Sequence, residues 1–449
     1  MNNAEMSTKM ARVHRSDDDR NVFTSPGHFA SSSEQVNDSG EQKVKRKSKL
    51  PKAPKRFRPE LWGSASLSLT SVTSSLNRTS GLSSDNIRSE FVLRSNRDPP
   101  LNSDVEFNDN LRRAREAINA GVRPMLIRAG SSGSYFIRDA SNTFLGVFKP
   151  KDEEPFAPLN PKWRKFFQRM LCFCCFGRAC LIPNHGYLSE TGASLIDERL
   201  CLNIVPKTRV IRLSSPAFFY GRCCGRAIEP YPKEGSYQIF VNGFKDAGAV
   251  LTEWANLGGP EAALTPEEYE LFLIQFQKMV VLDYIIRNTD RHSSNWLIRY
   301  IPGKEIRLAA IDNGLAFPVQ HPENTSRFRQ FPFGWSSFSF AQQPWHEGLR
   351  NFLLQLLTPL FVHNLCLDIK NLFRHDSSTN RLLTYIQLRV LRGQLWNLRL
   401  ALMANEPPSQ LVKRPQILVR RRYSDLPASD DWDKCFRAKQ VDFSSPGCC

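Results

Sequence analysis

Apolar side chains are sparse over the first hundred residues and recur regularly after them. Residues 1–100 are dominated by Ser, Asn, Asp, Lys and Arg. A segment with so few large apolar side chains buries too little surface to offset the entropy of ordering, so we expect it to be disordered. Leu111, Ala114, Ala117 and Ile118 then recur at helical spacing. Order is therefore predicted to begin near Val105, with a helix.

The same patterns predict the later elements. Thr265 precedes Pro266 and stands three residues before Glu268, which gives an N-cap, a first-turn proline and a capping-box acid. The apolar run behind this cap predicts a central helix that is buried on most faces. Strands are predicted at 237–242, 296–298 and 308–311, and further helices at about 347–373 and 381–404.

Two aspartates and an asparagine carry the chemical signal. Asp290 is followed by Asn295 five positions later and by Asp312 17 positions beyond that. Phosphoryl transfer uses such a set: one Asp lies beside the attacking hydroxyl, and the Asn and second Asp hold Mg²⁺ on the ATP phosphates. For either motif alone, a buried Asp–Arg pair or an Asp-Asn-Gly turn is an equal alternative. Both motifs together, in this order, favour a kinase.

A candidate nucleotide site lies upstream. Gly130 and Gly133 belong to a turn of small residues that leads into a strand, where backbone amides can approach phosphate oxygens. Lys149 follows the apolar residues 145–148, as expected of a lysine that pairs with ATP phosphates. The turn is not a GxGxxG loop, and Lys149 alone fits a surface lysine of an edge strand equally well. The downstream aspartates favour the nucleotide role.

These motifs, in this order, resemble the type II phosphatidylinositol 4-kinase family. The matching stretches include residues 130–136, 147–155, 159–163, 186–190, 281–291 and 309–318, within roughly 108–404. The resemblance implies an α+β, two-lobed protein-kinase-like fold with a mixed α/β amino-terminal lobe and a mainly helical carboxy-terminal lobe. It also implies transfer of the ATP γ-phosphate to the 4-hydroxyl of phosphatidylinositol, with ATP and Mg²⁺ (or Mn²⁺) as cofactors.

The expected organisation has four parts. A disordered, basic and Ser-rich region at 1–100 precedes an amino-terminal lobe at 101–242, which holds a cysteine-rich, membrane-binding insertion at about 160–182. The carboxy-terminal lobe is expected at 243–405. Pro, Ser and charged residues then return, so 406–449 are predicted to be a disordered tail.

Site residues are assigned from the motifs and from the family pattern. Asp290 is the best candidate to accept or orient the inositol hydroxyl, Arg291 is expected to brace its loop, and the resemblance implies that Glu154 orients Lys149. Catalysis is assigned to Lys149, Asp290, Asn295 and Asp312, and metal binding to Asn295 and Asp312. Nucleotide contacts are assigned to Gly130, Ser131, Ser132, Gly133, Ser134, Lys149, Asp312 and the hinge residues Gln238, Ile239, Phe240 and Val241. Gly243 is expected to let the chain turn between the lobes.

One departure from the family pattern lies in the catalytic loop. His292 stands where members of the family usually carry glycine, so the loop resembles that of phosphoinositide 3-kinases. Histidine ionises near neutral pH, which makes His292 a candidate second proton acceptor. Loop histidines more often serve only as hydrogen-bonding groups, and that alternative is favoured.

The second departure is the cysteine cluster. Cys-Cys-Pro-Cys-Cys in the family is Cys172-Phe-Cys174-Cys175 here, after a leucine. We predict that these three cysteines are S-acylated, because bases and aromatic residues flank them over 162–173, as in interfacial helices that face anionic headgroups. A buried helix with unmodified thiols is the alternative. Zinc is disfavoured because no second cysteine pair has ligand spacing.

The charge balance agrees with a membrane partner. The 449 residues include 61 Lys and Arg against 44 Asp and Glu, a net charge of +17. No zinc-finger, helix-turn-helix or RNA-reading pattern is visible, so we expect no nucleic-acid partner. Nine of the sixteen residues 43–58 are basic, which fits lipid binding, an import signal or a solvated tail. Neither a signal peptide nor a transmembrane stretch is predicted.

The sequence therefore predicts a kinase whose partners are phosphatidylinositol and a membrane surface. The expected location is the cytoplasmic face of the trans-Golgi network, endosomes or plasma membrane. Two alternatives stay open: a protein kinase related to lipid kinases, and a kinase-fold membrane scaffold that has lost activity. The intact set Lys149, Asp290, Asn295 and Asp312 argues against the scaffold.

Overall fold

The computed structural model describes residues 101, 103–162, 179–223, 226–227, 229–324, 331–422 and 431–441. The predictions for the amino-terminal region, for the basic run at 43–58 and for the cysteines at 172–175 fall outside the described residues.

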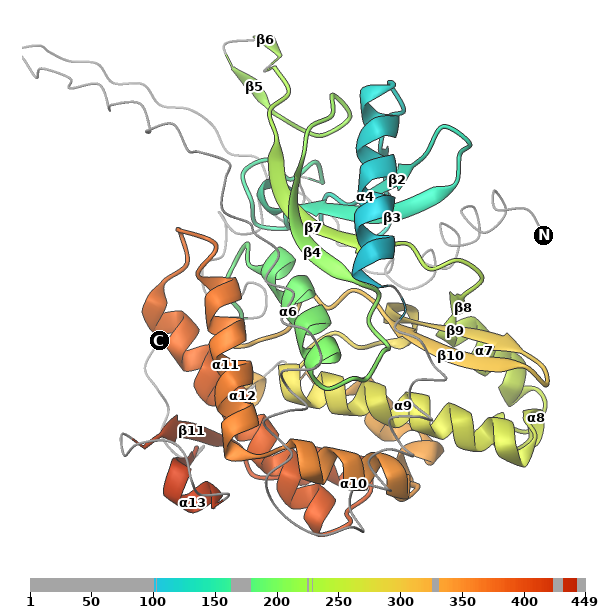
Figure 1. The fold of residues 1–449 in the computed structure, drawn as a ribbon, viewed down its shortest axis with the longest axis vertical. Coiled ribbons are helices and arrows are strands. Elements are labelled where there is room, and N and C mark those ends of the chain that lie inside the picture. The colour runs from blue at the N-terminus through green and yellow to red at the C-terminus, as the bar shows by residue number, and fades with distance from the viewer. Residues whose placement is uncertain are drawn as a thin grey trace, which may run out of the picture. The chain divides into compact units, whose positions relative to one another are not determined.

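A five-stranded antiparallel sheet with one covering helix forms the first lobe, called here the sheet lobe (Figure 1). Its strands, in the order β1-β2-β3-β7-β4, are β1 (Met125–Leu126), β2 (Tyr135–Arg138), β3 (Phe144–Pro150), β7 (Lys233–Ile239) and β4 (Thr208–Leu213). Helix α4 (Asp104–Asn119) starts at a capping box made by Ser103 and Glu106. Its buried Phe107, Leu111 and Ala114 pack against the sheet, which confirms the predicted helical stripe.

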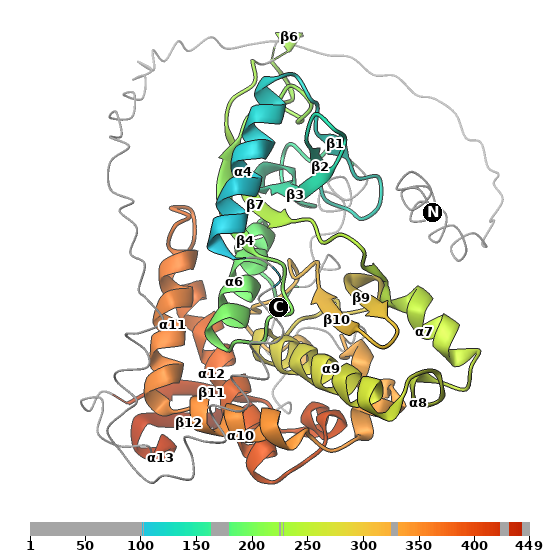
Figure 2. The ribbon, with the colours of Figure 1, turned by 45° about the vertical axis from the view of Figure 1, so that its right-hand side comes forward.

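The second lobe, called here the helical lobe, is built around α9 (Pro266–Ile286). Thr265 and Glu268 form the predicted capping box, and the second half of the helix is buried almost completely. Around it lie α6 (Gly186–Arg199), α7 (Ala247–Ala255), α8 (Pro260–Ala263), α10 (Glu347–Leu356), α11 (Pro359–Phe373) and α12 (Arg381–Met403) (Figure 2). Helix α6 precedes two strands of the sheet in sequence, but its apolar side chains belong to the core of the helical lobe.

A small sheet positions the motif residues beside α9. It has the order β10-β9-β8 and consists of β8 (Lys245–Asp246), β9 (Trp296–Ile301) and β10 (Glu305–Ala310), all antiparallel. Strands β9 and β10 confirm the predictions at 296–298 and 308–311. The region predicted to be helical at 347–373 is confirmed and consists of two helices, α10 and α11, which meet at 79° because Pro359 starts a new helix. Likewise, the strand predicted at 237–242 is β7, which ends at Ile239.

The expected disordered tail at 406–449 was wrong for the residues that the structure describes. This part of the chain holds η6 (Pro408–Lys413), β11 (Ile417–Arg421), α13 (Trp432–Cys435) and β12 (Phe436–Gln440), and β11 pairs with β12. Isolated apolar residues in a polar segment explain the error. Val419, Trp432 and Phe436 are buried against the helical lobe, and Trp432 packs on Trp396 of α12 with ring centroids 5.2 Å apart.

The carboxy-terminal strand passes close to α12 at Gly393. A Cβ at Gly393 would overlap the carbonyl oxygen of Ile417, so only glycine lets β11 approach the helix this closely.

A short hairpin, β5 (Arg222–Cys223) with β6 (Arg226–Ala227), extends between β4 and β7. No single helix among the described residues is long and apolar enough to cross a membrane.

Candidate active site

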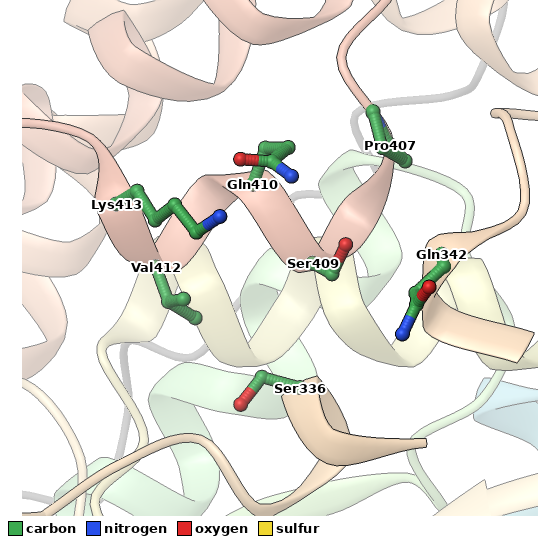
Figure 3. Close-up of a pocket in the computed structure, with 7 residues that line it drawn as sticks. All are labelled: Ser336, Gln342, Pro407, Ser409, Gln410, Val412 and Lys413. Carbon is green, nitrogen blue, oxygen red and sulfur yellow. The ribbon is translucent and has the colours of Figure 1, made fainter. Parts of the chain in front are cut away.

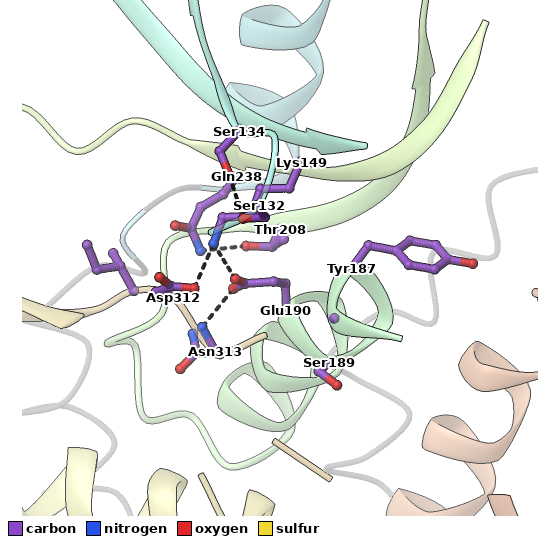
Figure 4. Close-up of polar contacts among 12 residues, drawn as sticks. Ser132, Ser134, Lys149, Tyr187, Ser189, Glu190, Thr208, Gln238, Asp312 and Asn313 are labelled. Atoms are coloured by element: carbon purple, nitrogen blue, oxygen red, sulfur yellow. Dashed lines mark hydrogen bonds and ion pairs between the residues drawn. The ribbon is translucent and has the colours of Figure 1, made fainter. Parts of the chain in front are cut away.

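Lys149 joins the two lobes at one point. It comes from β3, and its Nζ lies 2.5 Å from Glu190 Oε1 and 3.0 Å from Asp312 Oδ1 (Figure 4). Glu190 lies on α6, and Asp312 directly follows β10 and Ile311. The structure therefore brings together Lys149 and Asp312, two predicted site residues that are 163 positions apart.

Glu190, which the sequence analysis did not select, holds this arrangement. Its side chain is 3% exposed, and its second oxygen, Oε2, accepts the backbone N–H of Asn313 at 3.0 Å. One carboxylate therefore fixes both Lys149 and the segment that carries Asp312. In kinases a glutamate on the helix beside the sheet pairs with the phosphate-binding lysine in this way.

Glu154 does not take the role that the resemblance implied. Its two oxygens accept the backbone N–H groups of Gly186 at 3.0 Å and Tyr187 at 2.7 Å, so it caps the start of α6. Burial raises the Glu154 pKa to about 7, although these two N–H donors oppose the shift. Glu154 thus supports the helix that bears Glu190, and it is Glu190 that contacts Lys149.

Charges at the junction favour the ion pairs. Burial alone would lower the pKa of Lys149, but the carboxylates of Asp312 and Glu190 outweigh it and the pKa is raised. The Lys149 ammonium lowers the pKa of Asp312, against the opposing effect of burial. Burial raises the pKa of Glu190, with Lys149 opposing. Lys149 therefore stays charged, and Asp312, whose side chain is 54% exposed, presents a carboxylate to ligands.

Asp312 sits in an unusual backbone conformation. Its φ of 51° lies in the left-handed region, which non-glycine residues rarely adopt and which occurs often at functional sites. The neighbouring Asn313 is fully buried and donates from its side chain to the Ala310 carbonyl at 3.2 Å. The buried side chain of Asn313 therefore fixes the Asp-Asn-Gly turn, and the side chain of Asp312 is exposed to solvent.

The loop after α9 carries Asp290 and Asn295. Helix α9 ends at Arg287, whose φ of 47° turns the chain. The Asp290 N–H donates to Asn288 Oδ1 at 2.8 Å, and Asn295 Nδ2 donates to the Asp290 carbonyl at 2.8 Å. The Ile311 N–H donates to the Asn295 carbonyl at 3.1 Å, which ties the loop to the start of the Asp312 segment.

Arg291 braces the loop, as predicted. It is buried and pairs with Asp283 of α9 at 3.0 Å. Its Nη1 also donates to the carbonyls of Asn295 and, at 2.6 Å, Ile311, and its Nη2 donates to Asn313 Oδ1 at 2.5 Å. The buried Asp–Arg pair considered as an alternative therefore exists, between Asp283 and Arg291, and it serves the loop that carries the candidate catalytic residues.

His292 is exposed and forms a local contact. Its Nδ1 lies 2.7 Å from Ser294 Oγ, within the same loop. This geometry agrees with the favoured prediction of a hydrogen-bonding group in the loop.

Glu153 holds the glycine-containing turn through a backbone hydrogen bond to Gly133. The Gly133 N–H donates to the Glu153 carbonyl at 2.8 Å, and a Cβ at Gly133 would lie 2.7 Å from Glu153 Cβ. Gly130 has a φ of 75°, which favours glycine. Ser132 Oγ and Ser134 Oγ are 3.2 Å apart, and Asn160 Nδ2 donates to the Ser131 carbonyl at 2.9 Å. All five predicted turn residues therefore lie in an ordered turn beside β2.

At the hinge, the sheet already uses some of the predicted backbone groups. The N–H groups of Ile239 and Phe240 donate to the Lys207 and Leu145 carbonyls at 3.1 and 3.0 Å. Gln238 donates from Nε2 to Thr208 Oγ1 at 3.0 Å. Val241 is the first of the four hinge residues beyond these bonds. Gly243, with a φ of 79°, makes the predicted turn.

The donor set fits a hard divalent cation. Asp312 offers carboxylate oxygens and Asn295 an amide oxygen, which are ligands that suit Mg²⁺, and Mg²⁺ at such sites usually completes its shell with phosphate and water. Among the described residues, no group of three or more His, Cys, Asp or Glu could hold a metal.

A separate cavity of about 470 Å³ lies between η6 and the 334–342 segment and is lined by Gln410 and Lys413 among others (Figure 3). It shares no residue with this site.

Comparison with known proteins decides the family. Residues 130–397 match the family described as phosphatidylinositol 3- and 4-kinase. A type 2-beta phosphatidylinositol 4-kinase of Xenopus tropicalis is 40% identical over 391 residues, which cover 76% of this chain and 78% of that protein. This chain belongs to the type 2 phosphatidylinositol 4-kinase family. The type 2-alpha enzyme of Danio rerio is 40% identical over 78% of this chain and 85% of its own length. The type 2-beta enzyme of Rattus norvegicus is 42% identical over 70% and 73%.

Membership in the type 2 phosphatidylinositol 4-kinase family confirms the resemblance drawn from the sequence, the two-lobed kinase fold and the enzyme class. The cysteine-rich insertion stays a prediction, because its centre lies outside the described residues. The sequence did contain a signal for Glu190. It is an acidic residue among small residues in a helix, and a carboxylate that is buried in such a helix needs a partner of opposite charge.

Proposed function

We propose that this protein transfers the γ-phosphate of ATP to the 4-hydroxyl of phosphatidylinositol and so forms phosphatidylinositol 4-phosphate. The observation that carries the proposal is the Lys149–Glu190–Asp312 junction, with Asn295 tied to it through Ile311. Phosphoryl transfer needs positioning and charge neutralisation more than covalent catalysis, and this junction provides both. The phosphatidylinositol 4-kinase relatives indicate the substrate.

Each group at the junction has a distinct task. Lys149 binds the α- and β-phosphates of ATP once its contact with Asp312 gives way to phosphate. Asp312 and Asn295 would hold Mg²⁺, which would supply charge neutralisation at the phosphates. Glu190 keeps Lys149 in place throughout, because its own contact to the Asn313 N–H is independent of the nucleotide. Nucleotide binding therefore replaces the Lys149–Asp312 ion pair, while the Lys149–Glu190 ion pair keeps Lys149 in position.

The remaining nucleotide contacts come from the sheet lobe. Backbone N–H groups of the turn at 130–134 approach the phosphates, as glycine-containing turns do. At the hinge, Val241 is the residue we assign to adenine, because the N–H groups of Ile239 and Phe240 are already bonded within the sheet lobe. This narrows the four hinge residues named from the sequence to one donor.

Asp290 is assigned to the attacking hydroxyl. Its backbone is fixed by Asn288 and Asn295, and its side chain is half-buried beside the exposed His292. A carboxylate held in this way can orient the inositol 4-hydroxyl and accept its proton. His292 is assigned a local role in the loop, through Ser294.

Substrate access requires a membrane surface. We assign S-acylation to Cys172, Cys174 and Cys175, with a location on the cytoplasmic face of the trans-Golgi network, endosomes or plasma membrane. Two acyl chains, or one chain with a basic patch, bind a bilayer firmly. Serine at all three positions should move the protein from the membrane to the soluble fraction. Retention of that variant in the membrane fraction through a high-salt wash would refute the assignment.

The decisive experiment supplies labelled ATP, Mg²⁺ and phosphatidylinositol vesicles, and identifies the hydroxyl that is phosphorylated. Asp312→Ala and Lys149→Met should each lower turnover by at least about a hundredfold, as the loss of preorganised charge does. Circular dichroism should show that both variants stay folded. Wild-type turnover in either variant, or label on a peptide but not on lipid, would refute the proposal.

A further inference from the structure

The turn that follows Lys149 contacts the helical lobe through Lys151 as well as through Glu154 at the start of α6. Lys151 begins the short helix η1 (Lys151–Glu153), and its Nζ lies 2.7 Å from Asp376 Oδ2. Asp376 belongs to the loop between α11 and α12, and its side chain is only 6% exposed. The contact links the sheet lobe, immediately beyond the nucleotide-binding lysine, to a loop that plays no part in the site described above.

The Asp376 carboxylate is held ready for this contact. Its Oδ1 accepts the Ser378 N–H at 2.9 Å and the Ser378 hydroxyl at 2.7 Å, and its Oδ2 pairs with Lys151. Ser378 Oγ also lies 3.3 Å from Lys151 Nζ. Burial would raise the Asp376 pKa, but the hydrogen bonds from Lys151 and Ser378 outweigh it and lower the pKa to about 2. Asp376 therefore stays a carboxylate at neutral pH.

Helix η1 also holds the phosphate-binding turn. The Glu153 carbonyl accepts the Gly133 N–H, while the buried Glu153 side chain accepts the Tyr135 hydroxyl at 2.5 Å and pairs with Lys233 at 2.7 Å. Lys149 lies two residues before Lys151. A displacement of η1 would therefore move Lys149 and the turn together, relative to Asp312.

We propose that Lys151 and Asp376 form a clamp that positions the nucleotide-binding elements of the sheet lobe over Asp312 and Asn295. Both are positioning residues, and the proposal rests on the proposed function. Bound ATP would contact Lys149 on one side, and Asp312 would hold its metal on the other, so the nucleotide would itself join the lobes. The clamp therefore matters most before ATP binds. Losing it lowers the fraction of competent molecules and raises the apparent Kd for ATP by the same factor.

The test uses Lys151→Met and Asp376→Asn, which keep side-chain size and remove one charge each. We expect the KM and the calorimetric Kd for ATP to rise about five- to tenfold, which corresponds to a five- to tenfold fall in the fraction of molecules competent to bind ATP. The kcat on phosphatidylinositol vesicles should stay within about twofold of wild type. The double variant should be no worse than either single variant, because all three remove one contact. Arg112→Met, which breaks exposed pairs within α4, is the control and should change neither constant.

Four outcomes separate the explanations. Ser378→Ala keeps both charges and should raise the Kd by a smaller factor, so the clamp stays testable even where Lys151→Met fails to fold. Weaker ATP binding in Lys151→Met with unchanged binding in Asp376→Asn would assign Lys151 directly to phosphate and overturn the clamp. A fall in kcat with unchanged KM and Kd would also overturn it. A wild-type protein that binds ATP but leaves the lipid unphosphorylated would refute only the proposed function.

Discussion

Replacing Glu190 by glutamine tests the junction most directly. Glu190 accepts from two donors, the Lys149 ammonium at 2.5 Å and the Asn313 N–H at 3.0 Å. Glutamine has the same size but only one acceptor oxygen, and its amide group would face the second donor. Glu190→Gln therefore loses one of the two bonds and the negative charge while the volume of the site is kept.

The expected loss can be worked from the burial of the pair. Removing one partner of a buried ion pair costs about 3–5 kcal/mol. Lys149 keeps Asp312 as a second partner, so we take the lower end, about 3 kcal/mol, which is roughly a hundredfold in kcat/KM.

The assay is initial-rate phosphorylation of phosphatidylinositol vesicles over a range of ATP concentrations. Glu198→Gln is the matched control: it lies two turns further along α6 and pairs with Arg209 at 2.8 Å, away from Lys149. We expect Glu198→Gln to stay within about threefold of wild type, as partly exposed pairs contribute little. Activity of Glu190→Gln within the same range, in a folded protein, would refute the assigned role of Glu190.

Three further predictions address separate parts of the chain. Burial raises the Glu154 pKa to about 7, so Glu154 contributes stability that is fully present below its ordinary value near 4.5 and is lost as the pH rises through 7. The neutral Glu154→Gln lacks that loss, and urea unfolding should show its stability relative to wild type rising by about 3 kcal/mol from pH 4.5 to 8; a pH-independent difference would contradict this. Gly393→Ala should destabilise the protein by at least about 2 kcal/mol, since its Cβ overlaps the Ile417 carbonyl, whereas helix propensity alone predicts a gain of about 1 kcal/mol; a raised melting temperature would show the approach of β11 to be wrong. His292→Gly should keep turnover within about threefold and retain the acid limb of the pH–rate profile, because the exposed His292 ring hydrogen-bonds to Ser294 within its own loop; a large fall in turnover with unchanged ATP affinity would make it a proton acceptor.

Residues whose relative positions follow from local spacing could be predicted from the sequence. The structure places Asp290 and Asn295 on one loop that is hydrogen-bonded to the segment of Asp312, as the motif spacing predicts, and their catalytic roles stay predictions. Thr265 and Glu268 were identified because a cap needs only four consecutive residues. A lysine after an apolar stretch is weak evidence by itself, and Lys149 could be predicted only because the motif of Asp290, Asn295 and Asp312 lies downstream.

Residues whose role depends on a distant partner were missed. Glu154 and Glu190 are both acids near Lys149 in the family pattern, and only the packing of α6 shows which one reaches the ammonium. The carboxy-terminal elements were missed for a related reason. Val419 and Trp432 are isolated in a polar segment, and their burial comes from α12, which lies far away in sequence. Composition averages over such residues and therefore predicts disorder.

The strand β11 has a genetic consequence. Every residue assigned to phosphate, metal or lipid hydroxyl lies before position 314, so a gene cut short after Asn405 would still encode all the residues to which we assign catalysis. That product would lack Ile417, Val419 and Phe436, and the apolar face of α12 beneath them would meet water. A premature stop codon between Asn405 and Ile417 should therefore abolish activity in cells through loss of folded protein, although every residue assigned to catalysis is still encoded.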